Sequence, residues 1–360
     1  MSENSGVRGI TALVTGGSGF VGQRLVEMLI ERGASEVISF DIAPKPNDAI
    51  NDERIRYVQA DITNASEVIG AMKGVNCVWH MAALVGPFHS KDKYFEVNYK
   101  GTLNVLEACR INGVKKMIFS SSPSTRFDGK DIDGLSEDQL TFPKKFLQLY
   151  AETKAMAEQE VMKSCHFGEI MVIAIAPHQV YGPRDSLFLP NLLTVAGQGR
   201  LRIFGSGRNK VSMTFVDNYC HALIIGYDSL RPDSPCLGKF YIVTDGGYKY
   251  FWKILDEAVV EMGFTSLWLK FKLPYFLLMF LAYICNFLGF ILNTKLRLNP
   301  FNVKMLTIHR WFNIEAARRD LKYEPLYTFD EGWAKTLKYF REVWLPNSQS
   351  EKTFPRGKKD

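Results

Sequence analysis

The chain lacks several features that would assign it to a particular class of protein. Its 360 residues contain no C-x-x-C pair, no internal repeat and no spaced set of metal ligands, which argues against a zinc module or a repeat fold. The six cysteines are scattered and stand mostly in apolar runs. We therefore expect free thiols in a reducing compartment, and no metal site.

The charge is also modest, with a formal net value of +6 and no block of lysine or arginine. A nucleic-acid partner is not expected for such a sequence. The same balance suits either a slightly basic soluble surface or a protein that meets an anionic membrane. The first residues, MSENSGVRG, are polar and run directly into an apolar segment, so we expect no signal peptide.

What the chain does contain is a regular alternation of apolar runs and helical patterns. The runs at 10–17, 36–41, 55–61, 76–83, 115–122 and 170–177 predict six strands, and the patterns at 22–33 and 95–113 predict helices. Strands this apolar are buried on both faces, which is typical of parallel strands joined by helices. The sequence therefore predicts an α/β fold with a doubly wound parallel sheet, the Rossmann arrangement.

A glycine loop, VTGGSGFVG, connects the first strand to the first helix. Gly16, Gly19 and Gly22 let the backbone turn tightly and approach a pyrophosphate, which then lies at the helix N-terminus. Asp41 ends the second strand, where a carboxylate accepts hydrogen bonds from the adenosine ribose hydroxyls and repels a 2′-phosphate. The sequence therefore predicts NAD, rather than NADP, as the cofactor.

Residues that follow neighbouring strands extend this predicted cofactor site. Asp61 ends the third strand and is placed to reach the adenine. Ala82 and Ala83 end the fourth strand and are small enough for the cofactor to lie across the sheet edge. We add Phe20, from the glycine loop, and Ile62, next to Asp61, to the expected contacts.

A tyrosine and a lysine stand four residues apart in LQLYAETKAMAEQE, so one helical face presents both Tyr150 and Lys154. A phenol has a pKa of ~10, but a nearby ammonium and an oxidised nicotinamide both favour the phenolate. Such a phenolate takes the proton of an alcohol while hydride leaves the same carbon. Lys154 is also placed to hold the nicotinamide ribose. Upstream, Ser122 or Ser124 is placed to donate a hydrogen bond to the substrate oxygen.

Together these motifs resemble an extended short-chain dehydrogenase/reductase and, more narrowly, the 3β-hydroxysteroid dehydrogenase family. The likeness covers about residues 10–343. It is carried by the segments TGGSGFVG, GVNCVWHMAA, YFEVNYKGTLNVLEAC, LYAETKAMAEQ, APHQVYGPRD, VSMTFVDNYCHA, GKFYIVTDGG and FNIEAARRDLKYEPLYTFDEG. The first and fourth occur across the whole superfamily, whereas PHQVYGPRD, FVDN and FNIEAARRDLKYEPL are more specific to this branch.

The resemblance implies roles for individual residues. It makes Tyr150 the proton acceptor, Lys154 its partner and Ser122 the third catalytic residue. Pro123 departs from the small residue usual at its position, which leaves the choice between Ser122 and Ser124 open.

The segment APHQVYGPRD adds further expected contacts. By the same resemblance, Pro177, His178 and Val180 match a segment that packs on the nicotinamide. For His178, a structural role at a strand end is an equally ordinary reading.

One apolar stretch, PYFLLMFLAYICNFLGFIL at 274–292, is long enough to cross a bilayer. It is equally compatible with a core helix or with a segment that lies in one leaflet. We expect membrane attachment, because an enzyme that acts on a sterol finds its substrate in a membrane. With no signal peptide expected, the catalytic lobe is expected to face the cytosol at the endoplasmic reticulum.

We divide the chain into an NAD-binding domain at 8–183, a smaller C-terminal substrate lobe at 184–345 that includes the apolar segment, and a disordered tail at 346–360. The resemblance implies oxidation of the 3β-hydroxyl of a sterol, with loss of carbon dioxide where the substrate is a 4α-carboxysterol. The expected partners are this sterol, membrane lipid and other enzymes of sterol C4-demethylation, and a homodimer is left open.

Three alternatives remain at this point. The first is a 3β-hydroxy-Δ5-steroid dehydrogenase/isomerase, which needs a second acid or base that the sequence does not identify. The second is an NAD(P)-linked sugar-nucleotide epimerase or reductase, against which the apolar stretch argues because its substrate is water-soluble. The third is a cofactor-binding protein without activity, against which the intact Tyr–Lys pair argues.

Overall fold

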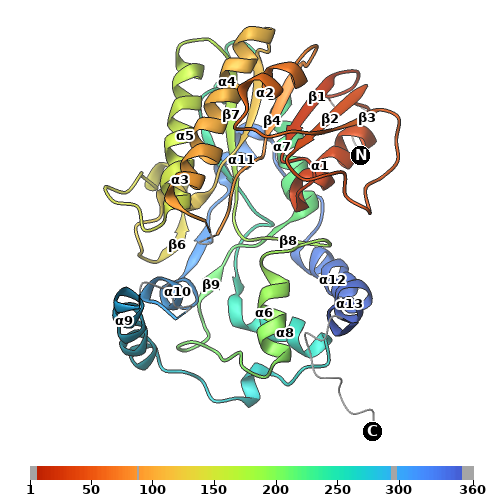
Figure 1. Ribbon diagram of the computed structural model, residues 1–360. Coiled ribbons are helices and arrows are strands. Elements are labelled where there is room, and N and C mark those ends of the chain that lie inside the picture. The colour runs from red at the N-terminus through yellow and green to blue at the C-terminus, as the bar shows by residue number, and fades with distance from the viewer. Residues whose placement is uncertain (1–5, 87–88, 293–297, 351–360) are drawn as a thin grey trace.

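A parallel sheet forms the centre of the molecule. The computed structural model describes residues 6–86, 89–292 and 298–350. Seven strands run in the order β11-β7-β5-β4-β1-β2-β3, and each neighbouring pair is parallel (Figure 1). The predicted doubly wound sheet is confirmed. The bounds of its strands are β1 Thr11–Thr15, β2 Glu36–Asp41, β3 Ile55–Gln59, β4 Cys77–His80, β5 Lys116–Ser120, β7 Met171–Pro177 and β11 Phe240–Val243.

The strand order reverses beside β1. The chain continues to β2 and β3 on one side of β1, whereas β4, β5 and β7 lie on the other. In open α/β sheets, a crevice forms outside the carboxyl ends of the strands at such a reversal, and ligands bind there. The glycine loop, residues 16–19, follows β1 directly and therefore lies at this crevice.

Helices cover both faces of the sheet. One face packs against α1 (Phe20–Glu31), α7 (Val216–Asp228) and α11 (Glu315–Leu321). The other packs against α2 (Ala65–Ala71), α4 (Gly101–Asn112) and α5 (Leu149–His166). Val14 and Leu13, which are neighbours in β1, belong to the cores on opposite faces because side chains alternate along a strand.

A smaller layer lies beneath the central sheet in Figure 1. It contains a four-stranded sheet in the order β12-β9-β13-β6 and the pair β10-β8. These strands are β6 Ile132–Leu135, β8 Val180–Tyr181, β9 Lys210–Val211, β10 Thr214–Phe215, β12 Lys249–Tyr250 and β13 Arg310–Phe312. Its helices are α6 Leu189–Gly197, α8 Phe251–Glu261, α9 Tyr275–Ile291, α10 Pro300–Met305 and α12 Phe329–Tyr339.

The structure differs in detail from the sequence analysis. Strand β11 lies within 184–345, the range that we assigned to the C-terminal lobe, but it joins the central sheet as its seventh strand by pairing with β7. The helix expected over 95–113 is a continuous run of α3 (Lys91–Tyr94), a π-helical segment η1 (Phe95–Lys100) and α4. Helix α13 (Leu345–Ser350) extends into the tail that we expected to be disordered, because Trp344 and Leu345 pack against the main core. The remaining tail residues, 351–360, lie outside the described residues.

The apolar stretch at 274–292 forms α9, which lies on the surface. Leu278 and Ala282 pack against Val303 of α10, whereas most other large side chains of α9 are exposed. Across the residues that the structure describes, we find no helix with both the length and the apolar character needed to cross a membrane.

A partly buried carboxylate joins the two layers. Asp245, just beyond β11, accepts hydrogen bonds from the Tyr181 hydroxyl, the Phe215 N–H and the Asn218 amide at 2.7–2.8 Å. The Asn218 side chain also donates to the carbonyl of Tyr327 and accepts from its N–H, at 2.8 and 2.9 Å. Burial raises the pKa of Asp245 to about 6, although each of these donors favours the carboxylate.

We predict that Asp245→Ala lowers the free energy of unfolding by about 3 kcal/mol, because three donors lose their acceptor in a buried site. Asp245→Asn should cost less, since its amide oxygen still accepts hydrogen bonds. The folded pKa of Asp245 lies above the value of an unfolded aspartate, so the wild type should gain stability relative to Asp245→Asn as the pH falls from about 6 to about 4. Urea unfolding at both ends of this range measures the gain. A constant difference would contradict the role assigned to this carboxylate.

Candidate active site

The segment from the loop after β1 into the first turn of α1 is too tight for side chains at several positions. Gly16 has a φ of +73°, and a Cβ there would lie 3.0 Å from the backbone of Ala82. A Cβ at Gly22 would overlap the carbonyl oxygen of Gly16. Gly19 precedes α1 and is exposed. The loop therefore keeps the N-terminus of α1 accessible to a phosphate group, as the sequence analysis expects.

Asp41 lies against this loop from the end of β2. One of its carboxylate oxygens accepts a hydrogen bond from the Ser18 N–H at 3.0 Å, and the other accepts one from the Ala43 N–H at 2.9 Å. The carboxylate is thus held beside the glycine loop and is partly exposed. Ribose hydroxyls are suitable partners for it, whereas a 2′-phosphate is not.

The other expected cofactor residues occupy positions near the same edge. Phe20 begins α1, Ala82 and Ala83 follow β4, Pro177 ends β7 and Val180 begins β8. All five are partly buried.

Asp61 and Ile62 follow β3 and differ in exposure. The Asp61 carboxylate accepts a hydrogen bond from the Thr63 N–H at 2.8 Å, which fixes the turn. Ile62 is buried and lies close to Gly101 of α4. Contact of Ile62 with a cofactor stays a prediction.

Helix α5 brings Lys154 beneath the end of β5. The lysine is 3% exposed, its Nζ donates to the Ser120 carbonyl at 2.6 Å, and it lies 4.3 Å from the centroid of the Phe119 ring. Burial lowers the pKa of Lys154 to about 8, and the negative charge of Glu158 opposes that shift. The ammonium is therefore present at neutral pH but is easily lost above it.

Tyr150 lies one helical turn from Lys154 and lines a hollow together with Tyr94. Burial raises the pKa of the Tyr150 phenol, and a hydrogen bond with Ser122 lowers it. Lys154 is not among the causes of this shift, so its predicted effect on the phenol stays a prediction. Ser122 is the serine that contacts Tyr150, whereas Ser124 lines the adjoining hollow.

A buried ion pair supports the segment 121–127 after β5, which contains Ser122 and which we call the serine loop. Arg126 donates to both carboxylate oxygens of Glu158, and its guanidinium lies 3.4 Å from the centroid of the Phe240 ring. The Ser121 hydroxyl donates to the same carboxylate. Because Glu158 belongs to α5, the pair ties the loop of Ser122 to the helix that carries Tyr150.

The sequence analysis missed Asn98, in the π-helical segment η1. Its amide accepts from the Leu84 N–H at 2.7 Å and donates to the Leu84 carbonyl and to the Thr153 hydroxyl at 3.1 and 3.2 Å. Asn98 therefore holds the segment after β4 against α5, close to Lys154. A buried asparagine inside an apolar helix was the available signal, and π-helical turns often mark functional sites.

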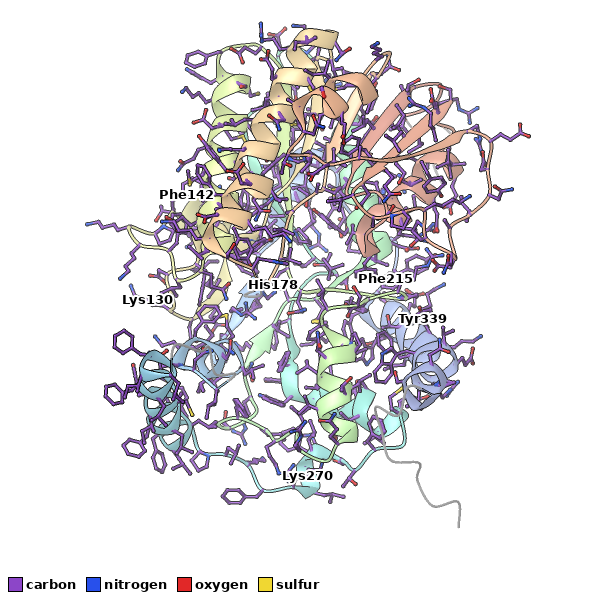
Figure 2. All side chains as sticks on the ribbon, viewed as in Figure 1. Lys130, Phe142, His178, Phe215, Lys270 and Tyr339 are labelled. Atoms are coloured by element: carbon purple, nitrogen blue, oxygen red, sulfur yellow. The ribbon has the colours of Figure 1, made fainter. Side chains whose placement is uncertain are left out.

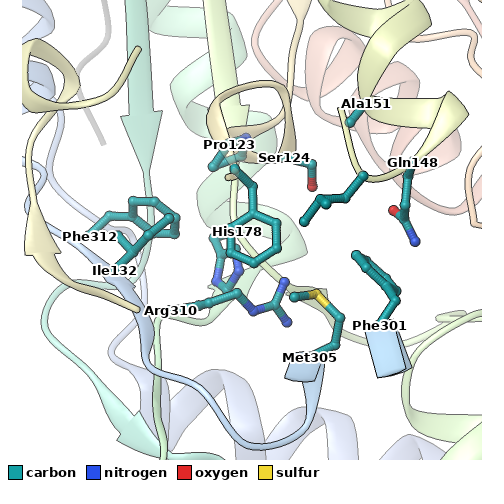
Figure 3. Close-up of a pocket in the computed structure, with 12 residues that line it drawn as sticks. Pro123, Ser124, Ile132, Gln148, Ala151, His178, Phe301, Met305, Arg310 and Phe312 are labelled. Carbon is teal, nitrogen blue, oxygen red and sulfur yellow. The ribbon is translucent and has the colours of Figure 1, made fainter. Parts of the chain in front are cut away.

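Two adjoining hollows of about 210 and 220 Å³ lie beside Tyr150 and share Leu147, Gln148 and Phe301. The walls of the first are mostly apolar (Figure 3). Those apolar residues come from the loop after β5, from β6, from α5 and the segment before it, from α10 and from β13, namely Pro123, Phe127, Ile132, Leu147, Ala151, Phe301, Met305 and Phe312.

Arg310 places a cation in this apolar hollow, and the sequence analysis missed it. Figure 3 shows its guanidinium beside His178 and Met305. Among the described residues its side chain forms no hydrogen bond or ion pair, and burial lowers its pKa to about 10, so it stays charged at neutral pH. A lone arginine in the apolar sequence IHRWF was the available signal.

His178 lies next to this arginine and does not compensate its charge. Its Nδ1 donates to the Ser212 carbonyl at 2.8 Å, which leaves Nε2 without a proton in the neutral ring. Burial lowers the pKa of His178 to about 3, and the charge of Arg310 contributes to the shift. The hollow thus offers a fixed positive charge to an anionic group.

A glycine loop with a carboxylate at the second strand, and a Tyr–Lys pair beside an apolar hollow, define a dehydrogenase of the extended short-chain class. The sequence matches the model of the 3-beta hydroxysteroid dehydrogenase/isomerase family over residues 13–273, which is more than half of the chain. The chain therefore belongs to this family. It is an oxidoreductase that uses NAD, as the sequence analysis predicts.

Several proteins with assigned activities are similar in sequence to this chain over nearly its whole length. The sterol-4-alpha-carboxylate 3-dehydrogenase (decarboxylating) of Mus musculus is 32% identical over 336 residues, covering 92% of this chain and 91% of that protein. The 2-alkyl-3-oxoalkanoate reductase of Stenotrophomonas maltophilia (strain K279a) is 33% identical over 327 residues, covering 89% and 96%.

Solved structures share the fold. The epimerase Mth375 of Methanothermobacter thermautotrophicus has a TM-score of 0.74 and 24% identity, covering 97% of each chain. The dTDP-glucose 4,6-dehydratase DesIV of Streptomyces venezuelae, solved with NAD bound, has a TM-score of 0.71 and 22% identity, covering 93% and 98%. At these identities the likeness concerns the fold alone.

We predict that Asp41→Ser relaxes the preference for NAD over NADP, because it removes the carboxylate that repels a 2′-phosphate. The ratio of kcat/KM values for the two cofactors should fall by about tenfold or more, which is the size expected for one charged hydrogen-bonding partner. Asp330→Ser, at an exposed aspartate of α12, is the matched control and should leave the ratio unchanged. A wild-type enzyme that already prefers NADP would refute this reading of Asp41.

Proposed function

We propose that the protein oxidises the 3β-hydroxyl of a sterol that carries a carboxylate at C4, with release of carbon dioxide. The observation that carries this proposal is Arg310, an uncompensated cation in an apolar hollow beside the Tyr150 site. An apolar wall suits a sterol ring system, and a guanidinium suits a carboxylate, which it can bind through two parallel hydrogen bonds.

Each polar residue of the site then has a task. Tyr150, as phenolate, takes the proton of the C3 hydroxyl, and Ser122 donates a hydrogen bond to the oxygen as it becomes a carbonyl. Lys154 holds the nicotinamide ribose and keeps positive charge near the phenolate. NAD, when bound, supplies the hydride acceptor.

Loss of carbon dioxide then needs no further catalytic group. Oxidation at C3 turns the substrate into a β-keto acid, in which the electrons of the breaking C4–carboxylate bond flow into the new ketone as an enolate. The enolate takes a proton at C4. One NADH and one carbon dioxide should therefore appear for each substrate consumed.

The names of two relatives support a substrate of this kind. One name describes a reaction at C3 with a carboxylate at C4, and the other a reaction at C3 of an alkanoate whose carboxylate is attached to C2. In both, the carboxylate is attached to the carbon next to the reacting one. A guanidinium held at a fixed distance from Tyr150 is compatible with both the 4-carboxysterol and the alkanoate. The exposed apolar helix α9 favours the sterol.

Two alternatives fit the hollow less well. A Δ5-steroid isomerase needs a base that moves a proton from C4, yet the described residues that line the two hollows include no carboxylate, and His178 is too weak a base because of its lowered pKa. A sugar nucleotide would present many hydroxyls to walls that offer mostly carbon.

We also propose that the protein acts at the membrane of the endoplasmic reticulum, with its catalytic residues on the cytosolic side. The exposed apolar surface of α9 and the free cysteines support this location. Fractionation of cells that express a tagged chain would test it, and recovery in another compartment would refute it.

We predict that Tyr150→Phe lowers kcat by about a thousandfold or more, since it removes the phenol that accepts the hydroxyl proton in the proposed reaction. NAD affinity should change little, because the ring is retained. Stopped-flow NADH formation and fluorescence titration of the cofactor measure the two effects. Near-normal turnover in this variant would exclude Tyr150 as the base.

We predict that Arg310→Met lowers kcat/KM for a 4α-carboxysterol by about 10- to 100-fold, the range of one charge-assisted contact to a carboxylate. The same variant should oxidise a 4α-methyl sterol as well as the wild type does. NADH and labelled carbon dioxide are measured together. Met305→Leu, in the same hollow, is the control and should affect both sterols equally.

Other outcomes would redirect the proposal. Equal loss on the two sterols would give Arg310 a structural role. Faster oxidation of a 2-alkyl-3-hydroxyalkanoate than of any sterol would move the function to that substrate class.

A further inference from the structure

Helix α9 has an apolar surface that faces away from the protein. Its packed side consists of Leu278 and Ala282, which contact α10. On the opposite side, Phe276, Phe280, Phe287 and Phe290 are 64–84% exposed. Their spacing of three to four residues, completed by Tyr283, keeps them on one helical face. Figure 2 shows ring side chains projecting outward from α9.

The segment before α9 continues this surface. Leu269 and Phe271 are 82% and 72% exposed, and they stand next to Lys270 and Lys272. Monomeric proteins rarely expose so much contiguous apolar area without a partner that covers it. We call the exposed side chains of 269–271 and of α9 the apolar face.

Positive charge surrounds the apolar face. The sequence has no aspartate or glutamate between Glu261 and Glu315. Arg200 and Arg202 line a hollow of about 310 Å³ against α9. The Nζ of Lys270 is buried and has no hydrogen-bond partner among the described residues. Aromatic and aliphatic side chains beside cations are suited to the interface of a membrane that contains anionic lipids.

The wall between the apolar face and the active-site hollow is only one short helix thick. Val303 of α10 packs against α9, whereas Phe301 and Met305 of the same helix line the hollow beside Tyr150. Leu147, which faces α10 across both hollows, is 46% exposed at the rim. Apolar side chains of α10 therefore line both the surface beside α9 and the hollow next to the reacting groups.

We infer that the apolar face lies in one leaflet of a phospholipid bilayer, with Lys272 and Arg202 at anionic headgroups. The sterol then passes laterally from that leaflet into the hollow between α10 and Leu147, without crossing water. This inference rests on the proposed sterol substrate for the passage, but not for the docking. A helix that lies in the interface plane needs no bilayer-spanning length.

The test uses the purified full chain and the double variant Phe280→Ser/Phe287→Ser. Vesicles of phosphatidylcholine, with and without phosphatidylserine, measure binding by co-sedimentation. The double variant should bind about tenfold or more weakly, because two large apolar side chains no longer leave water. Phe167→Ser is the matched control, since Phe167 has the same 64% exposure but ends α5 on the other layer. Lys272→Gln should weaken binding to the anionic vesicles alone.

Activity assays distinguish an effect on membrane docking from an effect on catalysis. With a sterol embedded in vesicles, kcat/KM of the double variant should fall in parallel with its binding. With the same sterol delivered in cyclodextrin, it should match the wild type. Equal loss in both assays, or vesicle binding like that of the wild type, would overturn the inference. The inference would also be overturned if the wild-type protein did not bind vesicles and instead dimerised through the apolar face. If the wild type oxidises no sterol but vesicle binding still depends on Phe280 and Phe287, docking stands and the proposed function fails.

Discussion

The partly buried carboxylate of Asp245 sets the relation between the two layers, and the geometry of the active site depends on it. Its side chain accepts from Phe215, and its own N–H donates to the Met213 carbonyl at 2.9 Å, so the segment 212–215 is held against the end of β11. Ser212 in that segment donates its N–H to the Arg310 carbonyl at 3.0 Å and accepts from His178. One partly buried anion thus positions both the strand that carries Arg310 and the imidazole beside it.

The site concentrates positive charge at the edge of an apolar core. Burial lowers the pKa of both Lys154 and Arg310, which means that the protein loses stability to keep these cations where they are. Arg126, by contrast, is buried in direct contact with an anionic partner, Glu158. Arg310, which lacks such a partner within the described residues, is suited to an anionic group of a ligand, and this reasoning connects the fold to the proposed carboxylate.

Features that depend on local sequence could be predicted, whereas features that depend on contacts between distant parts of the chain could not. The six first strands, the glycine loop and the Tyr–Lys pair depend on local patterns, and the structure places them as predicted. Strand β11 could not be assigned to the central sheet, because its four residues pair with β7 more than 60 positions earlier. Arg310 belongs to a three-residue strand, and its long-range pairings with β6 and β9 bring it into the hollow. Asn98 was missed because its role comes from contacts with Leu84 and Thr153.

The orientation of the substrate links the chemistry to the surface. If the C4 carboxylate binds Arg310 and the C3 hydroxyl meets Tyr150, the polar end of the sterol lies deepest in the hollow. Its hydrocarbon side chain must then extend toward the rim formed by Leu147 and Phe301. That rim is next to α10 and the exposed side chains of α9. The apolar end of the substrate can therefore remain close to the lipid while its polar end reacts, so the cost of exposing a sterol to water never arises.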